Sequence, residues 1–215
     1  MTDQNQTKAL VLCSGGVDST TLLAMAVQKY GAANVFALSI SYGQKHVREI
    51  KSAQDVAAYY GVEQRFLDLG QIFAHSNCSL LSHSTQEVPH ESYAQQLDQT
   101  DGSPVSTYVP FRNGLFLSSA ASVALGLGCS VLYYGAHHDD WAGNAYPDCS
   151  LEFVEAMRAA LELGSGGTLT MEAPFVTWSC YEGGERPCGA CGTCIDRQRA
   201  FELNGTVDPL LKPAG

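Results

Sequence analysis

The chain has 215 residues, which is enough for one domain with a well-buried core and a small appendage but too few for two full domains. It carries 12 Lys and Arg against 22 Asp and Glu, a net charge of −10, which disfavours direct binding of nucleic acid and favours small-molecule substrates. The polar N-terminus and the absence of a long uninterrupted apolar stretch indicate no membrane span, and we expect a cytoplasmic protein.

In the first third of the chain, short apolar runs alternate with helical patterns. Strands are predicted at residues 9–12, 35–41 and 64–69, and helices at residues 20–30 and 45–60. Gly31 and Gly61 follow the two helices, in a position where glycine commonly ends a helix. Because strands and helices alternate with short connections, we expect parallel strands joined by right-handed crossovers.

The regular pattern is lost over residues 70–108, a polar stretch whose length is typical of a functional loop. It returns with helices at residues 113–125 and 151–163 and strands at residues 131–136 and 168–172. We therefore predict the α/β fold class, with a doubly wound parallel five-stranded sheet over residues 1–175 and a small C-terminal region over residues 176–215.

The segment SGGVDS, residues 14–19, lies between the first predicted strand and the first predicted helix. Its glycines allow the backbone to approach an anion, and the positive end of the helix dipole stabilises one. The segment has neither the Lys of the G-x-x-x-x-G-K-[ST] loop nor the glycine spacing of the dinucleotide fingerprint. Simple capping of the helix by Asp18 or Ser19 is the alternative. We expect a phosphate site, with Mg²⁺ screening the Asp18 carboxylate.

Four of the eight cysteines crowd together near the C-terminus as C-x7-C-x2-C-x2-C, formed by Cys180, Cys188, Cys191 and Cys194. Such a set suits one tetrahedral Zn²⁺, and an iron–sulfur cluster is the alternative. Because all four positions are thiols and none is left open, we expect one structural zinc per chain. The other four are expected to be packed thiols: Cys13, Cys78, Cys129 and Cys149.

Three further polar segments are candidate substrate contacts. SYGQKH follows the second strand and offers Lys45 and His46 to an anion, while VPFRNG places Arg112 and Asn113 before a helix. For that pair, helix capping by Asn113 and anion binding by Arg112 stay open. The loop GAHHDDWAGNAYPDC combines aspartates with an aromatic residue, which suits recognition of a purine-like base. The substrate candidates are Tyr42, Gln44, His46, Arg112, Asn113, His137, Asp140, Tyr146 and Asp148.

Taken together, SGGVDSTT, SYGQKH, VPFRNG, YPDC followed by EF, and TWSCYEGGERPCGACGTCIDRQRAF resemble the QueC family of 7-cyano-7-deazaguanine synthases. The motifs occur in the family order over nearly the whole chain. The resemblance implies a PP-loop ATP pyrophosphatase fold of the adenine nucleotide alpha hydrolase type. It also implies an ATP-dependent ligase that makes the nitrile preQ0 from 7-carboxy-7-deazaguanine and ammonia for queuosine biosynthesis, with one zinc on the four clustered cysteines and a homodimer.

The resemblance also assigns roles to residues. Catalysis falls to Ser14, Asp18, Ser19 and Lys45. ATP, with Mg²⁺, is expected to bind Cys13, Ser14, Gly15, Gly16, Val17, Asp18, Ser19, Thr20, Thr21, Leu22 and Leu23. The implied chemistry adenylates the carboxylate, forms the amide with ammonia, and then adenylates the amide so that its oxygen leaves. No glutaminase portion is visible, so ammonia is expected to enter free or from a partner.

The chain departs from the family pattern in one place. Pro174 is followed almost at once by Trp178, whereas the family has a Lys-bearing helix of several turns before TWSC. This short connection favours one alternative, a catalytically impaired nucleotide-binding protein. A QueC-like relative that attaches a deazaguanine to another target would share every motif. A tRNA thiolase is disfavoured by the acidic charge and by cysteines that the metal would occupy.

Overall fold

The computed structural model describes residues 7–45, 48–88, 103–135, 146–174 and 198. The chain divides into two compact units, residues 1–176 and 177–215, and the strands that the structure describes all lie in the first. They are β1 (Ala9–Leu12), β2 (Val35–Ser41), β3 (Glu63–Asp68), β4 (Val131–Tyr133) and β5 (Thr170–Glu172). Their order in the sheet is β3-β2-β1-β4-β5, and every neighbouring pair is parallel, which confirms the predicted doubly wound five-stranded sheet.

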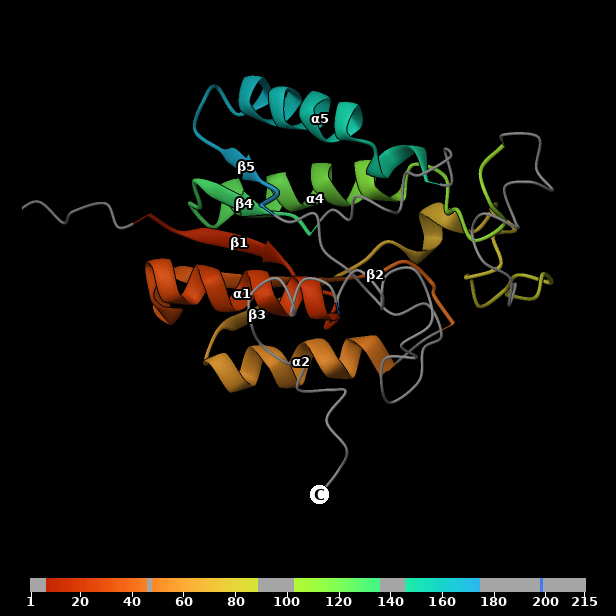
Figure 1. The fold of residues 1–215 in the computed structure, drawn as a ribbon, viewed down its shortest axis with the longest axis horizontal. Helices are drawn as coiled ribbons and strands as arrows, with labels where there is room; N and C mark the ends of the chain where they lie inside the picture. Colours follow the sequence, from red (N-terminus) through yellow and green to blue (C-terminus); the bar gives the residue numbers. More distant parts are fainter. Residues whose placement is uncertain (1–6, 46–47, 89–102, 136–145, 175–197, 199–215) are drawn as a thin grey trace, which may run out of the picture. The chain divides into compact units, whose positions relative to one another are not determined.

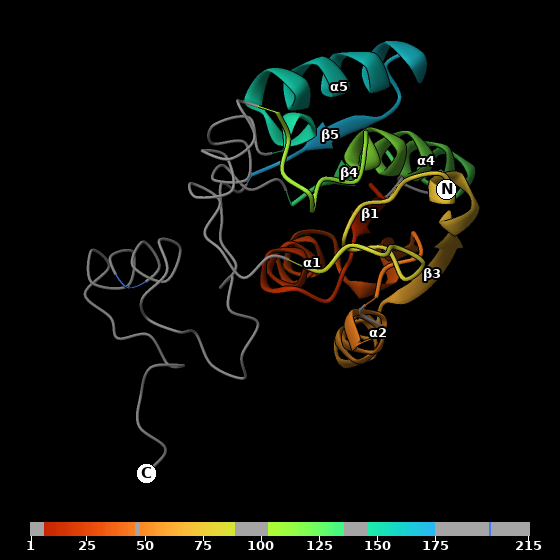
Figure 2. The same ribbon diagram turned by 90° about the vertical axis from the view of Figure 1, so that its right-hand side faces the viewer.

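Helices cover both faces of this sheet (Figures 1 and 2). On one face lie α1 (Val17–Tyr30) and α2 (Arg48–Tyr60), and on the other lie α4 (Arg112–Gly126) and α5 (Leu151–Gly164). Short 3-10 helices occur at η1 (Ala32–Asn34), η2 (Gly70–Phe73) and η4 (Pro147–Cys149). The result is a three-layer arrangement in which connections cross over the sheet.

The central strands are apolar on both faces because each face has its own core. Ala9 and Val11 of β1 pack with Leu22 of α1 on one side, whereas Leu10 packs with Leu117 of α4 on the other. All five side chains are fully buried. Alternate residues of a strand point to opposite faces, so a continuous apolar run such as ALVL is what a sheet covered on both sides requires.

Several predicted boundaries move, and two helix starts do so for local reasons. The first helix begins at Val17 instead of residue 20, because Gly16 already serves as its extended N-cap residue. The described part of the second helix begins at Arg48, and residue 45, where the prediction began it, lies outside the helix, because Gly43 has a φ of 83° and Gln44 pairs with Leu81 in an antiparallel bridge. Backbone committed to that bridge cannot also form a helical turn.

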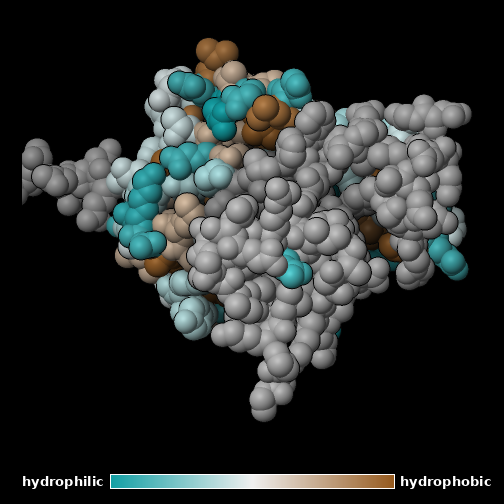
Figure 3. Space-filling view, in the orientation of Figure 1, coloured by the Kyte–Doolittle hydropathy of each residue, from teal (hydrophilic) through white to brown (hydrophobic). Residues whose placement is uncertain are grey.

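Part of the stretch predicted as irregular is packed against the body of the domain. Phe73, Cys78 and Leu81 are buried together with Val109 in a small core of their own. None of the helices that the structure describes is both long and apolar enough to cross a membrane. Figure 3 shows apolar residues over α5 at the top of the view among hydrophilic ones; Leu151 and Leu163 are the large apolar residues that this helix exposes.

Candidate functional site

The loop between β1 and α1 lies at the carboxyl end of the sheet, where the strand order reverses between β1 and β4. Gly135, just after β4, faces the same place: a Cβ on it would lie 3.5 Å from the Asp18 Cβ and 3.8 Å from the Ser19 nitrogen. This is the position at which open α/β sheets bind ligands. The loop therefore stands where the sequence predicted a phosphate site.

Gly15 shapes this loop. Its φ is 84°, and a Cβ there would lie 2.5 Å from the Ala53 nitrogen and 2.8 Å from the Glu49 carbonyl oxygen, both backbone atoms of α2. Positive φ and a contact this close both require glycine. The loop thus packs directly against the first turns of α2, with the Ser52 hydroxyl donating to the Gly15 carbonyl at 2.8 Å.

The buried Ser19 hydroxyl ties the two ends of the loop together. Its Oγ accepts from the Ser14 nitrogen at 3.2 Å and donates to the Gly16 carbonyl at 3.1 Å. The two serine hydroxyls lie 3.2 Å apart, and the Ser14 Oγ accepts from the Gly16 nitrogen at 3.3 Å. Neither serine caps α1 in the ordinary sense, because the N-cap residue is Gly16 and it has no side chain to offer.

Two polar side chains of the sheet support the loop between β1 and α1 through hydrogen bonds. The buried Ser39 hydroxyl donates to the Cys13 carbonyl at 2.7 Å and accepts from the Gln64 side-chain nitrogen at 2.8 Å. No role for Ser39, Gln64 or Ser52 was predicted from the sequence. A serine inside the otherwise apolar run VFALSIS is the one signal that could have pointed to the first of them.

Not every residue of the predicted nucleotide loop has a side chain at the surface. Leu22 and Leu23 are fully buried in the core, so their side chains anchor α1 instead of facing a ligand. Cys13 is buried as well, and burial raises the pKa of its thiol, partly offset by hydrogen bonds with Gly15 and Ser19. Ser14 is exposed, and Asp18 lies in the first turn of the helix.

At the end of β2, the predicted residues are held by the segment that follows η2. The Lys45 nitrogen donates to the Leu80 carbonyl at 2.9 Å, and its Nζ donates to the Gln86 carbonyl at 3.0 Å. The Gln44 Oε1 accepts from the Tyr42 nitrogen at 2.9 Å. One of the three ammonium protons of Lys45 thus bonds to a neighbouring loop, and the other two can bond to a ligand.

A second polar cluster surrounds the start of α4. The Arg112 Nη1 donates to the Tyr42 hydroxyl at 3.2 Å, and its guanidinium carbon lies 5.1 Å from the centre of that ring. Burial by itself would lower the pKa of Arg112, but Tyr42, Cys149 and Asp148 outweigh it and the pKa is raised. Arg112 is therefore a fixed cation at the carboxyl end of the sheet.

Asp148 and Asn113 bond to each other within the protein. The Asp148 Oδ2 accepts from the Asn113 backbone nitrogen at 2.8 Å, and the Asn113 side chain donates to the Asp148 carbonyl at 3.3 Å. Both residues are buried. The side chain of Asn113 does not cap α4. Instead, the carboxylate of Asp148, which lies 35 residues later in the sequence, accepts from a backbone N–H in the first turn of the helix. Tyr146 is buried too, with its hydroxyl 2.5 Å from the Thr107 Oγ1.

The Asp148 carboxylate gives a prediction for stability. Asp148→Ala should lower the free energy of unfolding by about 1–3 kcal/mol, because the Asn113 N–H loses its buried acceptor, whereas Asp148→Asn keeps an oxygen there. Burial raises the pKa of Asp148, against the opposing effects of the Asn113 N–H and Arg112. A folded pKa above the unfolded one gives stability that is present at low pH and lost as the pH rises.

Urea denaturation of the native protein and of the Asp148→Asn variant, from pH of about 4 to about 7, checks this. The variant should gain stability relative to the native protein as the pH rises through the raised pKa. A difference that stays constant, or that moves the other way, would show that folding does not raise the pKa of Asp148.

Several predicted residues lie outside the described part of the chain: His46, His137, Asp140, Cys180, Cys188, Cys191 and Cys194. Among the described residues, no group of three or more His, Cys, Asp or Glu side chains could hold a metal ion. The other four cysteines are buried thiols, as predicted. Burial raises the pKa of one of them, Cys129, to about 11.

Comparison with known proteins gives a consistent result. The sequence model for "Queuosine biosynthesis protein QueC" matches residues 8–178 and 175–205. A 7-cyano-7-deazaguanine synthase from Archaeoglobus fulgidus is 39% identical over 95% of this chain and 90% of its own length. The enzyme of the same name from Caldicellulosiruptor bescii is 40% identical over 94% of this chain and 96% of its own. Among solved structures, the NH3-dependent NAD synthetase from Campylobacter jejuni is 14% identical, with a TM-score of 0.41. The match covers 96% of this chain and 81% of that chain, and it adds nothing on function.

These alignments are longer than the part of this chain that they cover. The first has 225 positions, whereas 95% of 215 residues is about 204 residues. The second has 223 positions against about 202 residues, which are 94% of the chain. The relatives therefore carry about twenty residues that this chain lacks. The two matches to the family overlap at residues 175–178, where the sequence has its short connection.

Proposed function

Because the chain belongs to the QueC family of queuosine biosynthesis proteins, we propose that it is an ATP-dependent 7-cyano-7-deazaguanine synthase. The substrates are then 7-carboxy-7-deazaguanine, ammonia and ATP, and the product is the nitrile preQ0. The observation that carries the proposal is identity of 39–40% to relatives of that name over nearly the whole chain. The loop of residues 13–16 at the sheet's switch point supports it.

The proposed reaction activates one carbon twice. The carboxylate oxygen attacks the α-phosphate of ATP, which forms an acyl adenylate and releases pyrophosphate. Ammonia then displaces AMP and gives the amide. The amide oxygen attacks a second ATP in the same way, and loss of AMP and a proton leaves the carbon–nitrogen triple bond. A site that holds the departing pyrophosphate in a fixed place lowers the barrier of both activations.

The residues of the loop have clear parts in this scheme. The backbone N–H groups at the start of α1 and the helix dipole hold the phosphates that leave, and the Ser14–Ser19 pair keeps the loop in one shape. Asp18 would hold Mg²⁺, which screens the phosphates from the carboxylate. Arg112, fixed by Tyr42, is the candidate for the substrate carboxylate or a phosphate.

The metal, assembly and location are proposed on the same premise. Four thiols within a short segment are the donor set that suits structural zinc, so Cys180, Cys188, Cys191 and Cys194 would hold one Zn²⁺ that orders the C-terminal region. We propose a cytoplasmic homodimer that acts on small molecules without binding nucleic acid or membrane. Metal analysis of purified protein should give one zinc per chain; iron in its place would point to an iron–sulfur cluster.

One assay tests the function. The full chain is incubated with 7-carboxy-7-deazaguanine, ammonium and Mg-ATP, and the products are identified by mass spectrometry. We expect preQ0 with two AMP for each nitrile, because each activation consumes one ATP at its α-phosphate. ADP as the sole nucleotide product would contradict this mechanism.

The same assay separates two alternatives. The chain lacks about twenty residues of its relatives, which is the observation that favours a catalytically impaired nucleotide-binding protein. That protein would bind Mg-ATP and form no AMP. A QueC-like enzyme with another target would form AMP from the acid but release no nitrile.

A further inference from the structure

The predicted phosphate loop has a shortage of positive charge. Residues 13–23 contain no Lys or Arg, and Asp18 adds a negative charge in the first turn of α1. Pyrophosphate leaves with several negative charges, and backbone N–H groups with a helix dipole supply only partial ones. A full cation from another element would complete such a site.

The first turn of α2 is the element that lies against the loop. A Cβ on Gly15 would touch the Glu49 carbonyl oxygen at 2.8 Å and the Ser52 Cβ at 2.8 Å, and the Ser52 hydroxyl donates to the Gly15 carbonyl. Arg48 begins this helix, one residue before Glu49. The backbone of Arg48 is thus next to the contact between α2 and the loop.

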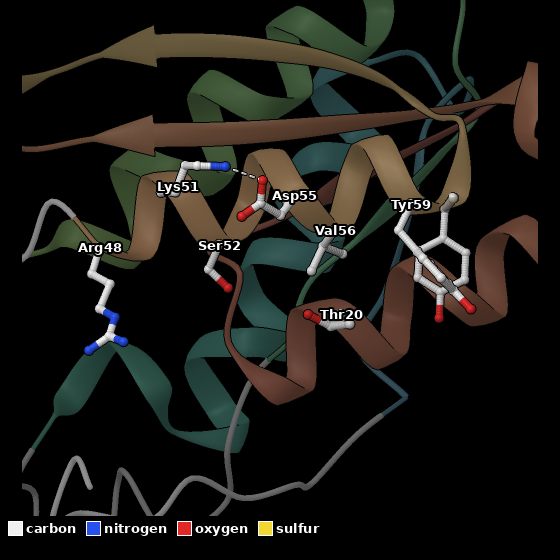
Figure 4. Close-up of a pocket in the computed structure, with 8 residues that line it drawn as sticks. Thr20, Arg48, Lys51, Ser52, Asp55, Val56 and Tyr59 are labelled. Atoms are coloured by element: carbon white, nitrogen blue, oxygen red, sulfur yellow. Dashed lines mark hydrogen bonds and ion pairs between the residues drawn. The ribbon is translucent and has the colours of Figure 1, made fainter. Parts of the chain in front are cut away.

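A groove between α1 and α2 brings the Arg48 side chain to the same side as the loop (Figure 4). The groove has a volume of about 510 Å³, and Thr20, Arg48 and Ser52 are among the residues that line it. In Figure 4 the Arg48 side chain leaves α2 on the side where Ser52 and Thr20 lie, at the end where α1 begins. Thr20 follows Ser19 directly, so this end of the groove adjoins the loop.

Arg48 also differs from the other cations at this edge in lacking a partner among the described residues. Lys51 pairs with Asp55, Lys45 donates to the Gln86 carbonyl, and Arg112 donates to Tyr42. Within the described ranges, Arg48 makes neither a hydrogen bond nor an ion pair, and it is exposed. Its five N–H donors are left for a ligand.

We propose that Arg48 is a phosphate-binding residue of this site: its guanidinium reaches across the mouth of the groove to the β- and γ-phosphates of ATP and holds the pyrophosphate that leaves. The inference rests on the proposed function, since it assumes that the loop binds ATP. Arg48 supplies in a second element the charge that the loop itself lacks.

The test measures binding of magnesium pyrophosphate to the full chain by calorimetry, together with AMP formation. Arg48→Ala should weaken pyrophosphate binding about tenfold and raise the KM for ATP, and Arg48→Lys should recover part of the loss, because a lysine keeps the charge without the bidentate fork. Lys51→Ala is the matched control: it removes the same charge from the same groove and should change binding by less than about twofold. Half-molar salt should shrink the difference.

The results distinguish a failure of this inference from a failure of the proposed function. Equal pyrophosphate affinity of Arg48→Ala and the native protein, or equal losses in Arg48→Ala and Lys51→Ala, would overturn the role of Arg48 while the proposed function stands. Native protein that neither binds pyrophosphate nor forms AMP would overturn the proposed function and this inference with it.

Discussion

Replacing Gly15 by alanine is expected to abolish nitrile formation, with a fall in turnover of at least about 100-fold, because the phosphate loop can no longer rest on α2. The added methyl group would lie 2.5 Å from the Ala53 nitrogen and 2.8 Å from the Glu49 carbonyl oxygen. Both are backbone atoms of a packed helix, which cannot rotate away as the end of a flexible side chain could. A φ of 84° adds about 1–2 kcal/mol of strain for any residue with a Cβ.

Gly31→Ala is the control that separates strain from collision. Gly31 has a φ of 80°, nearly that of Gly15, but nothing lies within 4 Å of the position that its Cβ would take. With its ψ of 145°, Gly31 lies in a backbone region that is nearly restricted to glycine, so the change should lower the free energy of unfolding by about 1–3 kcal/mol and leave turnover unchanged. The measurements are urea denaturation and steady-state AMP formation. Similar turnover of the two variants would remove the contact with α2 from the account of the site.

Asp18→Ala is expected to lower turnover by about 100-fold or more and to leave the zinc content and the fold intact. An acidic residue in the first turn of a helix that binds phosphate repels the ligand unless Mg²⁺ lies between them. Loss of the ion's charge removes several kcal/mol of stabilisation where the pyrophosphate leaves. Asp18→Asn keeps one oxygen ligand without its charge, so it should need more Mg²⁺ to reach half of its maximal rate.

Glu152→Ala is the matched control, because Glu152 is the acidic residue in the first turn of α5, on the other face of the sheet. That change removes the same interaction with a helix dipole, which is worth about 0.3–1 kcal/mol, and should leave turnover as it was. AMP formation is measured over a range of Mg²⁺ concentrations. An Asp18→Ala enzyme with native turnover and native Mg²⁺ dependence would contradict the proposed role.

Element types were predictable from the sequence, whereas several of their ends were not. The runs ALVL and VFALSIS are apolar without interruption, which is the pattern of strands covered on both faces, and both were predicted with their observed bounds. Residue 45, predicted as the start of α2, lies outside the helix because Gln44 pairs with Leu81. That partner lies 37 residues away, and a local pattern carries no trace of it.

For the site, the sequence by itself determined the chemistry on offer: a Ser-Gly loop without a lysine, an acidic residue at the start of a helix, and four clustered thiols. It determined the parallel sheet as well, because alternating strands and helices with short connections leave few other topologies.

Only the tertiary structure decided which polar groups bond to one another inside the protein. Asp148 and Tyr146 stood among the substrate candidates, yet their polar atoms bond to Asn113 and Thr107 inside the protein. No role was predicted for Ser39 and Ser52, yet their hydroxyls donate hydrogen bonds to the Cys13 and Gly15 carbonyls. The physical reason is that a buried polar group must find a partner, and the fold, which brings distant residues together, chooses which one.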